Sequence, residues 1–253
     1  MKKILCISDL HCGSLSGLMP KDFHDDANNE KFVMNEVQSY LFDNWYRMCK
    51  EVGHVDYCFV VGDLVDGANY GEKGKGQSTT DIYTQAKMAV TLLKMIDTTN
   101  FIIVDGSGYH VGQEISGDMV VSDMLQADFG NPDIDFQCES VKFHIRHHES
   151  WSRDPGGRHT SARKEANVSV LQNEEVDVFI RGHTHSFNFN GDKRNITVIL
   201  PCWKGPDKFQ RKKYMEIPDN GYVLFNVNGV NYDWEQTIFN VPKHMFRKSI
   251  KIV

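Results

Sequence analysis

Five short segments of the chain place carboxylates, imidazoles or a serine hydroxyl directly after a hydrophobic run. In chain order they are Asp9-Leu10-His11, Gly62-Asp63-Leu64-Val65-Asp66, Gly106-Ser107-Gly108-Tyr109-His110, His147-His148 and Gly182-His183-Thr184-His185. The apolar runs before them are typical of β-strands. In an open α/β sheet, ligands bind just beyond the carboxyl ends of the strands. Because carboxylate and imidazole are common ligands of divalent transition metals, the five segments together predict one shared metal site.

The first two segments differ in what they indicate on their own. Strand side chains alternate, so Asp9 and His11 face the same side and can converge on one cation; alone, the pair also fits a capped turn. Asp63 follows a glycine at a turn, and its carboxylate can bridge two cations, which an imidazole cannot. Two cations about 3.5–4 Å apart can clamp a phosphoryl group during in-line displacement. Asp66 is a catalytic-site candidate that orients a ligating histidine, or a helix cap or turn residue.

Of the two histidine pairs, Gly182-His183-Thr184-His185 gives the sharpest local signal, and His147-His148 is ambiguous. His183 and His185 stand two residues apart behind a glycine and after a buried strand, where packing has no obvious use for them. His147 and His148 are adjacent, so they face opposite sides of their strand and only one is expected to bind the metal. We expect that residue to be His147, with His148 as the alternative.

The combined order of these motifs resembles the signature of the calcineurin-like metallophosphoesterases, and the resemblance spans residues 9–185. It implies an α/β fold of two packed mixed β-sheets flanked by helices, with a βαβαβ core. It also implies a dinuclear site. In that site Asp9, His11 and His185 hold the first metal, Asp63 bridges, and His147 and His183 hold the second.

The third segment departs from the family pattern. The family usually has Gly-Asn-His-Asp or Gly-Asn-His-Glu there, whereas this chain has Gly-Ser-x-x-His, which resembles a variant of phage-type members. Ser107 then supplies a weak oxygen ligand to the second metal, or water takes its place. His110 serves as a ligand, as the general acid for the leaving oxygen, or only as a loop residue.

The activity implied by the resemblance is hydrolysis of a phosphomonoester or phosphodiester by a dinuclear metal-bound hydroxide. The cofactors are two divalent transition-metal ions, with Mn²⁺ first and Fe or Zn²⁺ as alternatives. A nuclease acting on DNA or RNA on the same fold is one rival. A non-catalytic binding module that kept the fold is another, and the missing asparagine is its best argument.

Substrate contacts are expected from the polar loop between the fourth and fifth segments. Arg158 and Arg163 each offer a fork of donors for a phosphate, although a solvated loop and helix start is an equally good interpretation. Trp203 either stacks a base or belongs to the core.

Composition narrows the class of protein. The 253 residues suffice for one domain over 1–253. The net charge of −6 argues against a broad DNA-binding surface, so the expected partner is a phosphorylated small molecule or nucleotide, with nucleic acid as a second candidate. Six scattered cysteines indicate reduced thiols. There is no signal peptide and no apolar run of about 20 residues, so we expect a cytoplasmic protein without a membrane partner. The oligomeric state stays open.

The elements that must position these residues follow from hydrophobic spacing. Helices are expected at about 31–50, 82–97, 115–126 and 161–173. Strands are expected at about 2–8, 55–61, 101–105, 133–138, 141–147, 176–181, 185–190, 195–200, 221–228 and 231–238. The alternation of strands and helices in the first half implies parallel strands joined by crossover helices.

Overall fold

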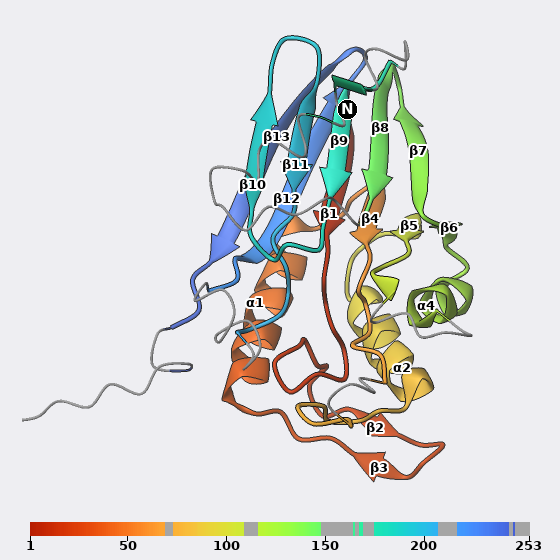
Figure 1. The fold of residues 1–253 in the computed structure, drawn as a ribbon, viewed down its shortest axis with the longest axis vertical. Helices are drawn as coiled ribbons and strands as arrows, with labels where there is room; N and C mark the ends of the chain where they lie inside the picture. The colour runs from red at the N-terminus through yellow and green to blue at the C-terminus, as the bar shows by residue number, and fades with distance from the viewer. Residues whose placement is uncertain are drawn as a thin grey trace, which may run out of the picture.

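Two β-sheets pack face to face and fill the upper part of the molecule in the view of Figure 1. The structure is a computed structural model that describes residues 1–68, 73–108, 116–147, 164, 167–168, 175–206, 217–242 and 245. The first sheet has the order β13-β12-β1-β4-β5-β6, and the second has the order β10-β11-β9-β8-β7. The expected α/β arrangement of two packed mixed sheets is confirmed.

The strands of the first sheet are β1 (Lys2–Ile7), β4 (Tyr57–Val61), β5 (Phe101–Val104), β6 (Asp128–Gly130), β12 (Asn220–Asn228) and β13 (Asn231–Phe239). Those of the second are β7 (Asp133–Cys138), β8 (Val141–Arg146), β9 (Val178–Arg181), β10 (Asn188–Gly191) and β11 (Ile196–Ile199). A separate hairpin joins β2 (His24–Asp25) to β3 (Glu30–Lys31).

Strand β1 shows how the first sheet is buried on both faces. Ile4 and Cys6 belong to the core between the two sheets. Leu5 and Ile7 belong to a second core, formed with the helices on the other face. Because side chains alternate along a strand, a strand covered on both sides must be apolar throughout, as this one is.

Three helices cover the outer face of the first sheet: α1 (Glu36–Val52), α2 (Ile82–Leu93) and α4 (Gly117–Leu125). Helix α1 begins later than the predicted residue 31, because Asn35 forms a capping box with Gln38. Residues 30–31 belong instead to the β2–β3 hairpin. Helix α2 ends at Leu93, short of the predicted 97.

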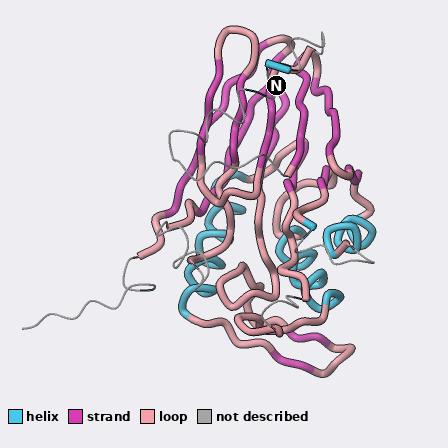
Figure 2. The backbone as a smooth tube through the Cα atoms, viewed as in Figure 1, coloured by secondary structure: helices cyan, strands magenta, loops and turns pink. Residues whose placement is uncertain are grey.

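The connections between the first three central strands confirm the predicted βαβαβ core. Strands β1, β4 and β5 are parallel, with α1 and α2 between them in the chain. In the second sheet β8 is parallel to β9. Long loops follow β1 and β4 before their helices begin (Figure 2). Those loops carry four of the predicted site residues, Asp9, His11, Asp63 and Asp66.

Most predicted strands agree with the structure to within about three residues at each end. The short strands β2, β3 and β6 were not predicted, because two or three residues are too few to show a period. Most of the predicted helix 161–173 lies outside the described residues.

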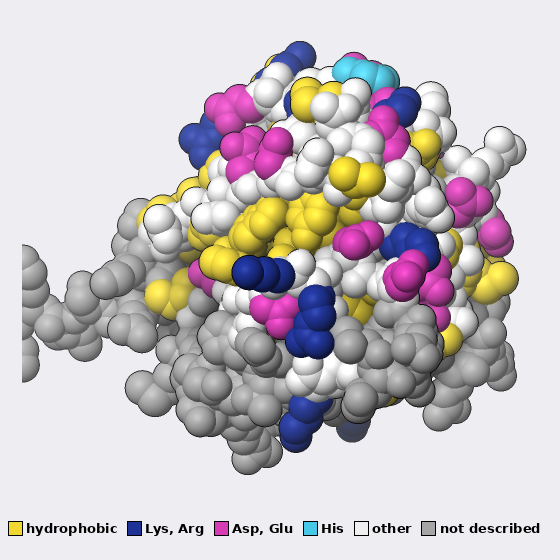
Figure 3. Space-filling model, turned by 90° about the horizontal axis from the view of Figure 1, so that it is seen from above, with side chains coloured by type: hydrophobic (Ala, Val, Ile, Leu, Met, Phe, Trp, Pro, Cys, Tyr) yellow, Lys and Arg dark blue, Asp and Glu magenta, His cyan; other side chains and the backbone are white. Residues whose placement is uncertain are grey.

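The structure bears on two features considered from the composition, the state of the cysteines and the presence of membrane-spanning helices. All six cysteines are free thiols. No helix in the described part of the chain has the length and apolarity needed to cross a membrane. The end of the sandwich that carries the hairpins shows hydrophobic side chains among charges of both signs (Figure 3). Among the described residues that this view shows, the basic side chains therefore form no broad surface.

Candidate metal centre

Six of the predicted ligands converge in two groups just beyond the carboxyl ends of the central strands. The first group is Asp9, His11 and His185, and the second is Asp63, His147 and His183. Within each group the nearest donor atoms all lie within 4.8 Å of one another. Five of the six residues are buried, and His183 is half-buried.

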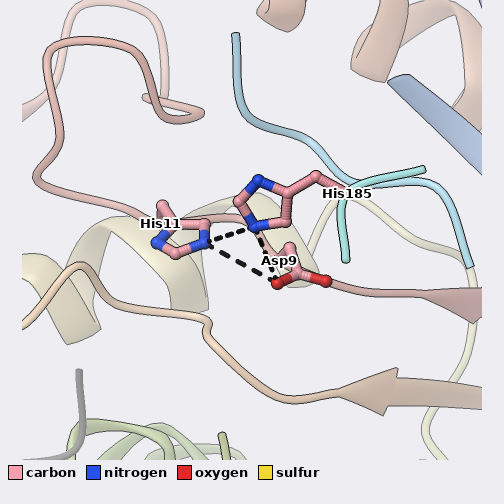
Figure 4. A group of neighbouring side chains, drawn as sticks. All are labelled: Asp9, His11 and His185. Carbon is pink, nitrogen blue, oxygen red and sulfur yellow. Dashed lines mark hydrogen bonds and ion pairs between the residues drawn. The ribbon is translucent and has the colours of Figure 1, made fainter. Parts of the chain in front are cut away.

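In the first group, three side chains from loops after β1 and β9 point at one another (Figure 4). The Nε2 atoms of His11 and His185 are 3.1 Å apart, and His185 Nε2 is 3.1 Å from Oδ1 of Asp9. His11 Nδ1 lies 3.1 Å from Oδ1 of Asp66. Because that nitrogen donates its hydrogen to the carboxylate, the Nε2 lone pair of the neutral ring faces inward, as a metal ligand requires.

The Asp9 carboxylate is oriented by its other oxygen. Oδ2 accepts the backbone N–H of His183 at 3.1 Å and lies 2.5 Å from the hydroxyl of Ser8. These contacts leave Oδ1 directed at the imidazoles of the first group. Ser8 is fully buried, so its contribution is to fix the carboxylate rather than to meet a substrate.

In the second group, His147 carries the clearest evidence that the donors fit a cation. Its Nδ1 donates to the carbonyl oxygen of Val61 at 2.7 Å. The Nε2 of the neutral ring is then a lone pair, and it lies 3.1 Å from Oδ2 of Asp63 without hydrogen-bond geometry. A lone pair against a carboxylate is repulsive unless a proton or a cation lies between them. A proton takes that place in the metal-free protein, and a metal ion would fit the same pair of donors.

The Asp63 carboxylate lies between the two groups. Its Oδ2 is 3.9 Å from His11 Nε2 in the first group and 3.1 Å from His147 Nε2 in the second. Its Oδ1 accepts the backbone N–H of Ser107 at 2.8 Å. This placement is the one that a bridging carboxylate needs.

Electrostatics without a metal show how strongly the pocket favours positive charge. Burial lowers the pKa of His147, but Asp63 and Asp9 outweigh it and raise the pKa to about 10. Burial raises the pKa of Asp9, yet His185 and His147 hold it well below its usual range. Burial lowers the pKa of His185 despite its contact with Asp9. The pocket thus pairs ionised carboxylates with imidazoles, one of which must lose a proton to bind a metal.

Most of the predicted ligand residues share an unusual backbone conformation. Asp9, His11, Asp63, His183 and His185 all have φ between 47° and 71°. Left-handed backbone is uncommon for residues other than glycine and clusters at functional sites. The tight turns aim consecutive ligands into one pocket.

The two motif glycines allow the backbone to approach His147. A Cβ on Gly62 would lie 2.5 Å from Nδ1 of His147, and Gly62 also has φ of +70°. A Cβ on Gly182 would lie 2.3 Å from the Ser8 hydroxyl. Any larger residue at either position would displace the ligands.

Asp66 contacts the predicted ligand His11, and Ser107 contacts the predicted ligand Asp63. Asp66 belongs to neither metal group. It orients His11, and Gln77 holds its second oxygen at 3.0 Å. The Ser107 hydroxyl is 3.2 Å from both oxygens of Asp63. Ser107 therefore steadies the bridging carboxylate in the structure, and its role as a ligand stays a prediction.

Four predicted site residues lie outside the described residues: His110, His148, Arg158 and Arg163. Their roles stay predictions. Trp203 is fully buried and packs against Trp45 at 4.9 Å between ring centroids. Of its two interpretations, base stacking is therefore wrong and a place in the core is confirmed.

Three buried residues near the site were not predicted as part of it: Ser8, Asp118 and Lys204. Asp118 accepts the N–H of Leu64 at 2.9 Å and so supports the turn that carries Asp63. Burial, Asp63 and Asp105 raise the pKa of Asp118 to about 7. Ser8 directly precedes the first motif, so its position in the sequence could have indicated it. Asp118 and Lys204 carry no such signal, because their contacts join distant segments.

Comparisons with known proteins support the fold. No family profile and no curated protein sequence matches the chain. Vps29 from Chaetomium thermophilum superposes with a TM-score of 0.50 at 13% identity, over 96% of this chain and 100% of that one. Zinc-bound Vps29 from Entamoeba histolytica gives 0.47 at 13% identity, over 94% and 99%. A novel archaeal phosphodiesterase gives 0.48 at 13% identity, over 93% and 99%.

The likeness to the Chaetomium structure covers nearly the whole of both chains. With the two-sheet topology, it shows that this chain shares the fold of that Vps29. The resemblance drawn from the sequence motifs is thus confirmed at the level of the fold.

Proposed function

We propose that this chain is a dinuclear metal-dependent phosphoesterase. The observation that carries the proposal is the pair of three-donor groups with the Asp63 carboxylate between them. Fold alone does not imply function, but this site has the ligand types, burial and orientation that two transition metals require. Mn²⁺ is the first choice, with Fe or Zn²⁺ as alternatives.

Some of the chain's residues would hold the metal ions, and others orient those ligands. Asp9, His11 and His185 would hold one ion, His147 and His183 the other, and Asp63 both. Two bound ions supply the Lewis acidity that polarises the phosphoryl oxygens and activates water. Asp66 keeps His11 in the tautomer that presents Nε2, and the Val61 carbonyl does the same for His147.

The proposed substrate is a phosphomonoester or phosphodiester of a small molecule or nucleotide. The net charge of −6 disfavours a long nucleic acid, so a nuclease is the weaker alternative. Two bound cations would supply locally the positive charge that a phosphate needs.

The test is metal reconstitution followed by turnover. We expect about two Mn²⁺ per chain by elemental analysis, and hydrolysis of a generic monoester or diester that is lost with EDTA. Asp63→Asn is the matched control, because it is nearly isosteric and removes only the bridging charge. A metal content near zero, with unchanged thermal stability on adding Mn²⁺, would overturn the proposal.

A second candidate is a binding module without turnover. The specific observation in its favour is that Ser107 stands where the family has asparagine, and its hydroxyl is within 3.2 Å of Asp63. Metal binding at normal stoichiometry, with no hydrolysis of either ester, would select this alternative.

A further inference from the structure

Lys204 is a buried lysine beside the first metal group that no motif accounts for. It lies on the segment after β11, and only 6% of its surface is exposed. Its Nζ is 3.5 Å from Oδ1 of Asp66. That same oxygen accepts the Nδ1 hydrogen of His11. Burying an ammonium is costly unless it is paired, so its position requires a reason.

The backbone around Lys204 is pinned on two sides. Trp203 N–H donates to the carbonyl oxygen of Asp9 at 3.0 Å, and Gly205 N–H donates to that of Ser16 at 2.7 Å. The Lys204 carbonyl accepts the Asn220 side chain at 2.9 Å. The segment is therefore fixed to the loop that carries the first ligands. The ammonium is delivered to Asp66 by rigid structure rather than by a free surface chain.

The Asp66 carboxylate does not need Lys204 to stay in place. Its Oδ2 accepts Gln77 at 3.0 Å, and His11 holds its Oδ1. Removing the ammonium should therefore leave Asp66 against His11 and change mainly the charge there. A carboxylate behind a ligating histidine increases the basicity of that ligand, and a cation on the same oxygen opposes the effect.

We propose that Lys204 is a positioning residue of the first metal group, whose ammonium shares the Asp66 oxygen and limits how tightly His11 holds a metal ion. The inference rests on the proposed metal binding. It assigns a second role to the Asp66 contact: the same oxygen that orients His11 also receives the charge that moderates it. A site with a moderated affinity keeps its ion exchangeable and leaves more of the ion's charge for the substrate.

The test compares Mn²⁺ affinity in three variants by calorimetry, after EDTA treatment. Lys204→Met removes the charge with little change in volume and should bind Mn²⁺ several-fold to about tenfold more tightly. Lys204→Arg keeps the charge and should stay close to wild type. Lys94→Met changes the net charge equally at an exposed C-cap of α2 and should leave the affinity unchanged.

The outcomes separate this inference from the proposed function. If wild type binds no Mn²⁺, the metal site itself fails. If wild type binds it and Lys204→Met binds equally or more weakly, Lys204 is only a structural partner of Asp66 and the inference is overturned. Circular dichroism of each metal-free variant checks folding, and Lys204→Gln carries the same test if the methionine variant does not fold.

Discussion

Asp63 and Ser107 contact each other, but their positions predict that substituting Asp63 impairs metal binding and turnover far more than substituting Ser107. Asp63 lies between both metal groups, at 3.9 Å from His11 Nε2 and 3.1 Å from His147 Nε2. Within the part of the chain that the structure describes, Ser107 contacts Asp63 by two donors, its backbone N–H at 2.8 Å and its hydroxyl at 3.2 Å. Truncating Ser107 to alanine removes the hydroxyl and leaves the N–H in place.

The expected magnitudes follow from those contacts. A hydrogen bond to a charged group contributes about 1.5–3 kcal/mol. The hydrogen bond from the Ser107 hydroxyl is long, at 3.2 Å, so we take the lower end of that range. It corresponds to about a tenfold loss of kcat/KM for Ser107→Ala. Removing one partner of a buried charge pair costs about 3–5 kcal/mol. Asp63→Asn should therefore lower kcat/KM by about 10²–10⁴-fold, because it removes the negative charge that both ions would share.

The assay measures two quantities on each variant: Mn²⁺ affinity by calorimetry and kcat/KM on an activated phosphodiester. Wild type and Ser107→Ala should both bind about two ions, whereas Asp63→Asn should fall below two or bind far more weakly. Thermal unfolding in EDTA checks that the metal-free variants fold. Equal losses in the two variants would refute the bridging role of Asp63.

Three further predictions concern protonation and packing. Because the pKa of His147 is raised to about 10 without metal, Mn²⁺ binding near pH 7 should release about one proton from its ring; calorimetry in buffers of different ionisation enthalpy measures this, and no release would contradict it. The pKa of Asp118 is raised to about 7, so its contribution to stability is present below about pH 4 and is lost as pH rises to 7. Asp118→Asn should therefore remove that slope and gain on the order of 4 kcal/mol at pH 8 in EDTA, whereas parallel denaturation curves across pH would count against the raised pKa. Phe143→Ala should cost about 3–5 kcal/mol in chemical denaturation, because its ring packs between the sheets against Phe59 and Phe225; exposed Val33→Ala should change stability by less than about 0.5 kcal/mol, and similar losses in both would refute the packing argument.

The sequence predicted the central strands and the ligand positions from local pattern and from the resemblance of the motifs. Asp9 and Asp63 follow β1 and β4, which are neighbouring parallel strands of the first sheet, so the local pattern alone places them together. His183 follows β9 of the second sheet, and it was joined to them by the resemblance of the combined motifs. The start of α1 could not be predicted from local pattern, since Phe32 and Val33 extend the apolar spacing of the helix. In the structure Phe32 is buried from the loop, and Asn35 begins the helix.

The residues that orient the ligands escaped prediction because they act across large sequence separations. Lys204 reaches Asp66 from 138 positions away, and Asp118 supports Leu64 from 54 positions away. Neither contact has a periodicity or a motif. Such residues can be identified only from the tertiary structure, although they affect the orientation and basicity of the ligands that the motifs identify.

The energetics of the site favour a metal centre over a packing explanation. Five ligand residues hold left-handed backbone, and each such conformation costs about 1 kcal/mol or more. Their sum is comparable to the whole stability of a typical domain. Two buried carboxylates, Asp9 and Asp63, add desolvation to that cost. A scaffold that only needed to pack would gain nothing from this arrangement, whereas bound cations would offset it by stabilising the folded state. The backbone strain and the buried negative charge therefore favour bound metal ions, as the ligand geometry does.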